Sequence, residues 1–182
     1  MFTTVAFIIY TLYLFTEDIL NINKKAYVDV RTKLYNKARW DEYIKEKIPE
    51  SETIGVMLLD LNGLKHTNDT YGHKVGDKMI VKFSEILRST FNSGEFICRW
   101  GGDEFSVVVR DADPQRMERY NLAIHKAVED YNSSGAKLPI YFACGYVLSS
   151  EFPDISRKEL LTKADARMYN DKQKWYDKQI NI

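Results

Sequence analysis

Apolar residues recur at alternating intervals of three and four along the first 26 positions of the chain, and no charged side chain interrupts the first 16. Such spacing predicts a helix with a heptad seam, the pattern by which two parallel helices pair in a coiled coil. The seam consists of Val5, Ile8, Leu12, Phe15, Ile19, Ile22 and Ala26. We therefore treat residues 1–28 as a helix separate from the rest of the chain.

Three interpretations of this helix stay open. It can anchor the chain in a membrane through residues 1–20, although a span needs about 20 apolar residues and this apolar block is shorter. It can be a dimerising helix in solution, a role that is compatible with anchoring. It can also pack on its own domain. A signal peptide is disfavoured because the segment has no basic start and no small-residue cleavage site.

From Asp29 onward, helical and strand-like patterns alternate. The run at 53–61 is almost wholly apolar, as expected of a strand buried on both faces. Two β-rich runs flank Gly101 and Gly102, and we predict a hairpin there because both glycines tolerate a positive φ. The predicted helices are 36–48, 63–71, 75–87, 113–131 and 156–175, and the predicted strands are 53–61, 96–100, 104–110 and 138–148.

This order of elements predicts an α/β protein of the α+β, ferredoxin-like kind, in which a mixed sheet is flanked by helices and preceded by the N-terminal helix. We assign residues 29–182 to one such domain, because no repeat or low-complexity linker divides them. The fold class by itself assigns no chemistry.

Composition narrows the classes of function. The 182 residues include 26 basic and 26 acidic side chains, so there is no net charge to attract nucleic acid broadly. A polyanionic ligand must therefore be held by a few placed groups. Cys98 and Cys144 lie far apart, without a CxxC or Cys/His cluster, which favours a reduced compartment such as the cytoplasm and argues against structural zinc.

Acidic residues stand where two predicted strands meet. The run at 53–61 contains Asp60 near its end, and the hairpin brings Asp103, with Glu104 beside it, to the start of another strand. Like charges a few ångströms apart raise each other's pKa unless a cation lies between them, so neighbouring strands would make this a divalent-metal site. Oxygen ligands favour Mg²⁺. The alternative is that these aspartates cap backbone donors at turns and never meet.

Four segments of the chain carry a family resemblance. They are RWGGDEF at 99–105, DLNGLKHTNDTYGHKVGD at 60–77, DVRTKLYN at 29–36, and ADARMYNDK at 164–172. In these segments the chain resembles the GGDEF family of diguanylate cyclases. The resemblance implies a nucleotidyl-cyclase fold related to polymerase palms, and condensation of two GTP molecules into cyclic di-GMP with release of two pyrophosphates.

The resemblance also implies a site for Mg²⁺ or Mn²⁺. Asp60 would bind the metal through its carboxylate, Leu61 through its backbone carbonyl, and Asp103 through its carboxylate. Asp103 is in addition the candidate catalytic residue that accepts the proton of the attacking 3′-hydroxyl. Two metals hold the triphosphate and lower the pKa of that hydroxyl. Glu104 would support a second metal, or it is simply an outward-facing strand residue.

For the base, the resemblance implies that Asn68 and Asp77 together recognise guanine. A carboxylate accepts hydrogen bonds from N1–H and from the exocyclic amine of guanine, and adenine lacks donors at these positions. Taken alone, Asp77 would instead be an acid that favours the first turn of a helix. His73 lies near the substrate or makes a structural hydrogen bond. Gly101 and Gly102 let the nucleotide approach closely, or serve only the turn.

For the triphosphate, Lys65 and Lys172 match positions that contact the β- and γ-phosphates, whereas a lone lysine on a polar helix is usually solvated. Backbone amides of Gly63 and Leu64 complete the phosphate site, as amides at helix starts do. Lys174 can replace a further phosphate contact of the family, one position out of register.

The chain departs from the family pattern at two further places. Where the family has an RxxD site that binds inhibitory product, this chain has Asn92-Ser-Gly-Glu95, so we predict that the common form of product inhibition is lacking. In the N-terminal motif, Arg31 replaces a leucine and Lys33 replaces a glycine, which alters that segment and leaves the catalytic set intact.

Together these inferences predict a GTP-using diguanylate cyclase that works as a homodimer, because one domain binds one GTP and the product needs two. Parallel N-terminal helices would raise the local concentration of the partner domains. We expect a cytoplasmic catalytic domain, free or anchored at the cytoplasmic face of the cell membrane, with no nucleic-acid partner. The alternative is a non-catalytic GGDEF module that binds GTP or a protein partner and regulates it.

Overall fold

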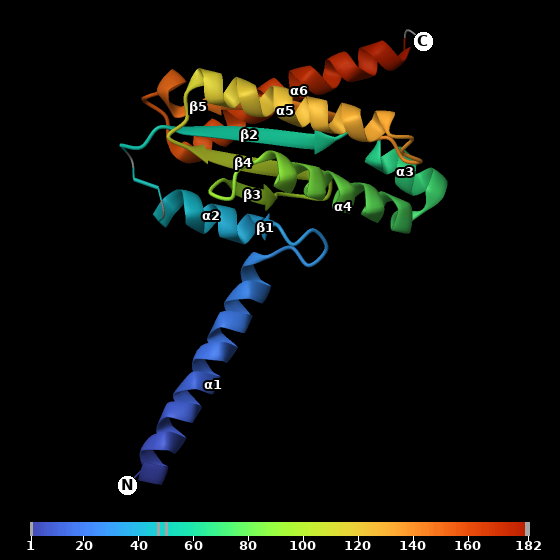
Figure 1. Ribbon diagram of the computed structural model, residues 1–182. Helices are drawn as coiled ribbons and strands as arrows, with labels where there is room; N and C mark the ends of the chain where they lie inside the picture. The colour runs from blue at the N-terminus through green and yellow to red at the C-terminus, as the bar shows by residue number, and fades with distance from the viewer. Residues whose placement is uncertain (1, 47, 50, 181–182) are drawn as a thin grey trace.

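The computed structural model describes residues 2–46, 48–49 and 51–180, and it describes side-chain surroundings for 5–16, 26–45, 48–49 and 51–177. The chain forms an α/β domain from which one long helix projects (Figure 1). The helices are α1 (Phe2–Tyr27), α2 (Lys37–Glu46), α3 (Leu64–Tyr71), α4 (His73–Thr90), α5 (Pro114–Ser133), the 3₁₀ turn η1 (Ser149–Glu151) and α6 (Arg157–Ile180). The strands are β1 (Tyr35–Asn36), β2 (Ile54–Leu61), β3 (Phe96–Arg99), β4 (Glu104–Arg110) and β5 (Phe142–Leu148).

The five strands form one sheet in the order β1-β3-β4-β2-β5. Strand β2 pairs antiparallel with β4 and with β5, β4 pairs antiparallel with β3, and only β1 runs parallel to its neighbour. The four longer strands therefore have the ferredoxin-like order, and β1 makes the sheet mixed, which confirms the predicted fold class. We did not predict β1, because a strand of two residues leaves no periodic signal.

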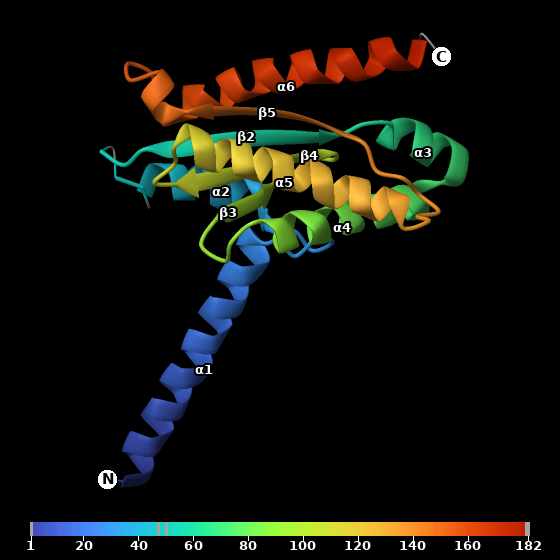
Figure 2. The ribbon, with the colours of Figure 1, turned by 45° about the horizontal axis from the view of Figure 1, so that its top comes forward.

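Helices cover both faces of the sheet. Figure 2 shows α4 and α5 on one side and α6 on the other, where α2 also packs. Every residue of β2 is buried, with Met57 and Leu59 in the core beneath α4 and α5, and Val56 and Leu58 in the core beneath α2 and α6. Alternating side chains of this strand therefore fill two separate cores, which explains its continuous apolar pattern.

Helix α6 lies directly on β5 at Gly145. A Cβ atom on this glycine would overlap with the backbone of Met168 and Ala164, so no side chain fits between strand and helix there. The backbones of α6 and β5 are consequently in van der Waals contact. Ala164 and Met168 of α6 therefore lie directly against the sheet.

The hairpin predicted at Gly101 and Gly102 is present, but the reason given for it is wrong. Strands β3 and β4 are antiparallel, and the amides of Trp100 and Gly101 donate to the Glu104 carbonyl across the turn, at 2.8 and 3.2 Å. Neither Gly101 nor Gly102 has a positive φ. The turn therefore does not need glycine for left-handed backbone, and Gly102 in particular borders open space.

Helix α1 points away from the domain (Figures 1 and 2). All side chains at 5–16 are exposed, including the seam residues Val5, Ile8, Leu12 and Phe15, so this part of the helix does not pack on its own domain. The side chains of the seam residues at 19 and 22 lie outside the described part of the chain. Over the described residues, no helix is both apolar and long enough to span a bilayer, and the predicted membrane anchor thus lacks support.

Lys33 has a left-handed backbone, with φ of 60°. Replacing it by glycine should raise the free energy of unfolding by about 0.5–1 kcal/mol, because the left-handed conformation costs an L-residue roughly 1–2 kcal/mol and the added freedom of glycine in the unfolded chain offsets part of that gain. Urea unfolding followed by circular dichroism measures the change. The matched Lys33→Ala variant keeps a Cβ and should show no such gain. Loss of stability in Lys33→Gly would contradict this account.

Candidate active site

Acidic residues from two paired strands meet at one end of the sheet. Asp60, near the end of β2, lies opposite Glu104 at the start of β4, and the Leu61 amide donates to the Asp103 carbonyl at 3.0 Å. Asp60 is almost fully buried, with 4% of its surface exposed. Strands β2 and β4 are therefore neighbours, as the predicted convergence of Asp60 with Asp103 and Glu104 requires.

Burial and mutual repulsion act on these carboxyl groups. Burial raises the pKa of Asp60, the charges of Asp103 and Asp165 raise it further, and an ion pair with Lys172 opposes the rise. Burial likewise raises the pKa of Glu104, and the nearby acids add to this effect. Asp165, from α6, belongs to the same acidic environment although the sequence assigned it no role. Its place in the ADARMYNDK segment was the only available signal.

Lys172 supplies the positive charge of this environment. Its Nζ lies 2.7 Å from Asp60 Oδ1, and the side chain is about one quarter exposed. Burial alone would lower the pKa of Lys172, but the hydrogen bond and charge of Asp60 outweigh it and raise that pKa. The sequence predicts a phosphate contact for this lysine, whereas in the structure it pairs with the buried carboxylate of Asp60.

The oxygen donors of this site are of the chemical kind that a hard divalent cation binds. Asp60, Asp103 and Glu104 offer carboxylate oxygens, and these are the donors that Mg²⁺ and Mn²⁺ prefer. Burial, with the neighbouring acids, raises the pKa of both Asp60 and Glu104, and Lys172 provides one positive charge at Asp60. Within the described residues, no three or more His, Cys, Asp or Glu side chains are grouped closely enough to hold a metal ion.

A cavity of about 640 Å³ opens beside these acids. Leu61 and Asp103 connect it to the strand ends, and α6 closes it. Its lining is Leu61, Gly63, Leu64, Lys65, His66, Asp69, Asp103, Lys172, Trp175 and Tyr176. Four residues predicted to hold the triphosphate, Gly63, Leu64, Lys65 and Lys172, are thus brought to one cavity. Lys174 lines a different cavity, together with Asp171 and Trp175.

The start of α3 faces this cavity without a side-chain cap. Gly63 is the N-cap residue with φ of 75°, and it has no side chain to accept a hydrogen bond from the first amides of the helix. Amides at a helix start carry partial positive charge and bind anions well. The ring of Trp175 comes within 4.0 Å of the place where a Cβ of Gly63 would be. We did not foresee this tryptophan, because nothing in the sequence pattern relates α6 to Gly63.

The guanine-reading candidates come from two helices that pack closely. Asn68 is in α3 and Asp77 is in α4, and the Asn68 side chain lies so near the Cα of Gly76 that a Cβ there would overlap with it. Asp77 is the fifth residue of α4, so the alternative that it serves the first helical turn is wrong. His73 is the first residue of α4 and is exposed.

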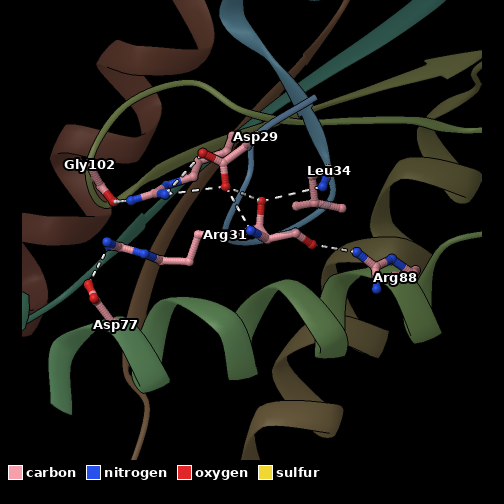
Figure 3. Close-up of polar contacts among 8 residues, drawn as sticks. Asp29, Arg31, Leu34, Asp77, Arg88 and Gly102 are labelled. Atoms are coloured by element: carbon pink, nitrogen blue, oxygen red, sulfur yellow. Dashed lines mark hydrogen bonds and ion pairs between the residues drawn. The ribbon is translucent and has the colours of Figure 1, made fainter. Parts of the chain in front are cut away.

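Asp77 forms an ion pair with Arg31, which belongs to the loop between α1 and β1 (Figure 3). A second arginine ties the same loop to the hairpin turn, since Arg99 lies 3.2 Å from Asp29 and donates to the Gly102 carbonyl at 2.8 Å. Burial would raise the pKa of Asp29, but hydrogen bonds from Thr32 and the charge of Arg99 lower it overall. This loop therefore contacts both the guanine-reading candidate and the hairpin turn.

Comparison with known proteins adds the family context. A family model described as "Diguanylate cyclase, GGDEF domain" matches residues 26–178. An uncharacterised 19.3 kDa protein of Streptomyces ambofaciens is 31% identical over 141 residues, or 78% of this chain and 75% of that protein. Diguanylate cyclase DosC of Escherichia coli K12 is 29% identical over 149 residues, which are 78% of this chain but only 32% of DosC.

Among solved structures, the coiled coil and GGDEF domain of DgcB from Caulobacter crescentus, in complex with c-di-GMP, is similar to this chain. The TM-score is 0.81 at 20% identity, over 94% of this chain and 93% of that one. At this identity the likeness supports the fold. The division of this chain at residues 28 and 29 stays a prediction.

Proposed function

The chain belongs to the GGDEF-domain family, and on this premise we propose that it is a diguanylate cyclase that condenses two GTP molecules into cyclic di-GMP and two pyrophosphates. The observation that carries the proposal is that Asp60 and Glu104 lie opposite each other on paired strands, next to Asp103, which lines the same cavity as the uncapped start of α3. Carboxylates next to an anion site are what a metal-bound triphosphate requires.

In the proposed reaction, Mg²⁺ or Mn²⁺ would be held by the carboxylates of Asp60, Asp103 and Glu104 and by the Leu61 carbonyl. When bound, the metal supplies charge neutralisation for the triphosphate and acidifies the attacking 3′-hydroxyl. The amides of Gly63 and Leu64 and the ammonium groups of Lys65 and Lys172 bind the β- and γ-phosphates. Asp103 accepts the proton of the 3′-hydroxyl.

Lys172 changes partner in this scheme. Its ammonium neutralises Asp60 at 2.7 Å, and the cavity that it lines also contains Lys65 and the start of α3. In the presence of substrate, Lys172 would leave Asp60 and bind the phosphates in the same cavity. One side chain thereby protects the buried carboxylate before substrate arrives and binds substrate afterwards.

The base is read by Asn68 and Asp77, with Asp77 accepting from N1–H and the exocyclic amine of guanine. Gly102 borders open space and leaves room for the nucleotide beside the hairpin turn. Each domain holds one GTP, so two domains must face each other for both phosphodiester bonds to form. The projecting helix α1, with its exposed seam, is the element that we propose pairs the chains.

We place the reaction in the cytoplasm, where thiols such as the free Cys98 and Cys144 stay reduced. The test is incubation of the purified chain with Mg²⁺ and either GTP alone or GTP together with ATP, and identification of the product by mass. Cyclic di-GMP is the expected product. Guanine-nucleotide binding without any cyclic dinucleotide at high protein concentration would favour the non-catalytic module instead, and a mixed-purine product would contradict the role of Asp77.

Cyclic di-GMP at micromolar concentration should leave the initial rate of synthesis unchanged. The position of the family's inhibitory aspartate is occupied by Glu95, whose buried carboxylate pairs with Arg116 and accepts a hydrogen bond from Tyr120 at 2.9 Å. This carboxylate is therefore engaged within the domain, and no arginine stands at Asn92 to bind product. Initial rates at increasing product concentration measure the effect. Strong inhibition that a Glu95→Gln variant relieves would contradict this prediction.

A further inference from the structure

Arg31 reaches from the loop before β1 to the second turn of α4, where its Nη1 pairs with Asp77 Oδ1 (Figure 3). Both side chains remain partly exposed, at 44% and 36%. An ion pair with that exposure adds little stability by itself. The contribution of the ion pair to folding therefore does not explain the position of Arg31. A ligand that binds beside the ion pair explains it better.

The loop that carries Arg31 is fixed on both sides of it. The Asp29 carboxylate accepts hydrogen bonds from the amide and the hydroxyl of Thr32, each at 2.7 Å, and Arg88 donates to the Thr32 carbonyl at 2.6 Å. Leu34 is buried in the core beneath α4 and α5. The backbone at Arg31 is thus held in place, and its side chain is directed toward Asp77.

Guanine offers a specific partner to a guanidinium at this place. Its O6 is the neighbour of N1, and O6 and N7 together form an acceptor edge that arginine reads better than any other side chain. A carboxylate that accepts from N1–H therefore places O6 within reach of a donor already bonded to that carboxylate. Adenine presents an amino donor at the same position, which the positive charge of Arg31 would repel.

We propose that Arg31 is a substrate-binding and specificity-determining residue whose guanidinium donates to O6 of the guanine that Asp77 binds. This inference rests on the proposed function, because Asp77 is assigned to guanine only there. Arg31 keeps its bond to Asp77 and gains the base as a second partner. The opposite possibility is that Arg31 blocks Asp77 and must leave before the base enters, and the two possibilities predict effects of opposite sign.

Isothermal titration of the full chain with GDP and with ADP, in the presence of Mg²⁺, tests the proposal without turnover. Arg31→Leu should weaken GDP binding about ten-fold or more and leave ADP binding unchanged or slightly stronger, so that the preference for guanine falls by the same factor. Arg31→Lys, which keeps the charge but loses the planar fork, should lie between. Unchanged preference, or tighter GDP binding in Arg31→Leu, would overturn the proposal.

Two further measurements distinguish loss of the contact with O6 from other causes of weaker binding. IDP keeps O6 and N1–H but lacks the exocyclic amine, so Arg31→Leu should weaken IDP binding by the same factor as GDP binding. Lys33→Ala, an exposed position of the same loop, is the matched control and should bind GDP as the unaltered chain does. Arg31→Met, which also lacks a donor, repeats the test if the leucine variant unfolds at a lower temperature.

The proposed function can fail separately from this inference. A chain that prefers GDP through Arg31 but produces no cyclic dinucleotide from GTP would overturn the cyclase and leave the role of Arg31 intact. A chain that produces cyclic di-GMP with the same GDP preference in Arg31→Leu would overturn the role of Arg31 alone.

Discussion

Replacing Asp103 by Asn should reduce the rate of cyclic di-GMP formation at least about a thousand-fold. The change removes one of the carboxylates that we propose hold the metal, and it removes the proton acceptor for the 3′-hydroxyl. A loss of three powers of ten corresponds to about 4 kcal/mol of transition-state stabilisation, within the range that metal ligands contribute. Product formation from GTP, separated by chromatography, measures the rate.

The fold should survive this substitution, because Asn has nearly the shape of Asp and the backbone of residue 103 already pairs with Leu61. Asp130→Asn is the matched control. Asp130 lies on the exposed side of α5, paired with Lys126, and its loss should leave the rate unchanged. If Asp103→Asn retained more than a tenth of the activity, both proposed roles of Asp103 would be wrong.

Introducing glutamate at Ile8, Leu12 and Phe15 together should lower activity about a hundred-fold at submicromolar protein, with recovery as the protein is concentrated. These seam positions are exposed in the structure, and paired helices would raise the effective concentration of the second domain into the millimolar range. Charges on the seam would prevent that pairing. Activity as a function of protein concentration, beside sedimentation velocity, measures the effect.

A second triple variant identifies which face of α1 matters. Phe7, Tyr10 and Leu14 are also apolar and exposed, but they lie on the side of the helix away from the seam. Glutamate at these three positions should leave the dependence on protein concentration unchanged. An equal loss in both variants would show that α1 is buried uniformly, and the paired-helix interpretation would then fail.

The sequence predicted the larger elements because their patterns are local. The apolar run of β2, the helical spacing in α4 and the glycine pair between β3 and β4 each predicted the element that the structure contains. Strand β1 was not predicted because it has only two residues, and its pairing with β3 joins parts of the chain that are far apart in sequence. The hairpin at Gly101 and Gly102 was predicted correctly, but not for the right reason, because neither glycine has a positive φ. The backbone dihedral angles there are set by the hydrogen bonds of the whole turn.

The residues assigned to the candidate site stay a prediction, and the electrostatics of the site were not predicted. Motif resemblance identified Asp60, Asp103 and Lys172, and the strand register places the two aspartates at one end of the sheet. The ion pair of Lys172 with Asp60 and the influence of Asp165 were not predicted, because they depend on how α6 crosses the sheet. Arg31 was noted only as a departure from the family pattern, since its contact with Asp77 spans 46 positions of sequence.

The contact of α6 with β5 at Gly145 limits how Lys172 can change partner from Asp60 to the phosphates. Because no side chain separates the two backbones there, α6 cannot move closer to the sheet as substrate enters. Lys172 is one helical turn beyond Met168 on the same element, so it changes partner by rotating its own side-chain bonds. Such rotations take picoseconds to nanoseconds, far less than the encounter of two domains. Each half-site should therefore be fully rearranged around its nucleotide before the partner domain arrives.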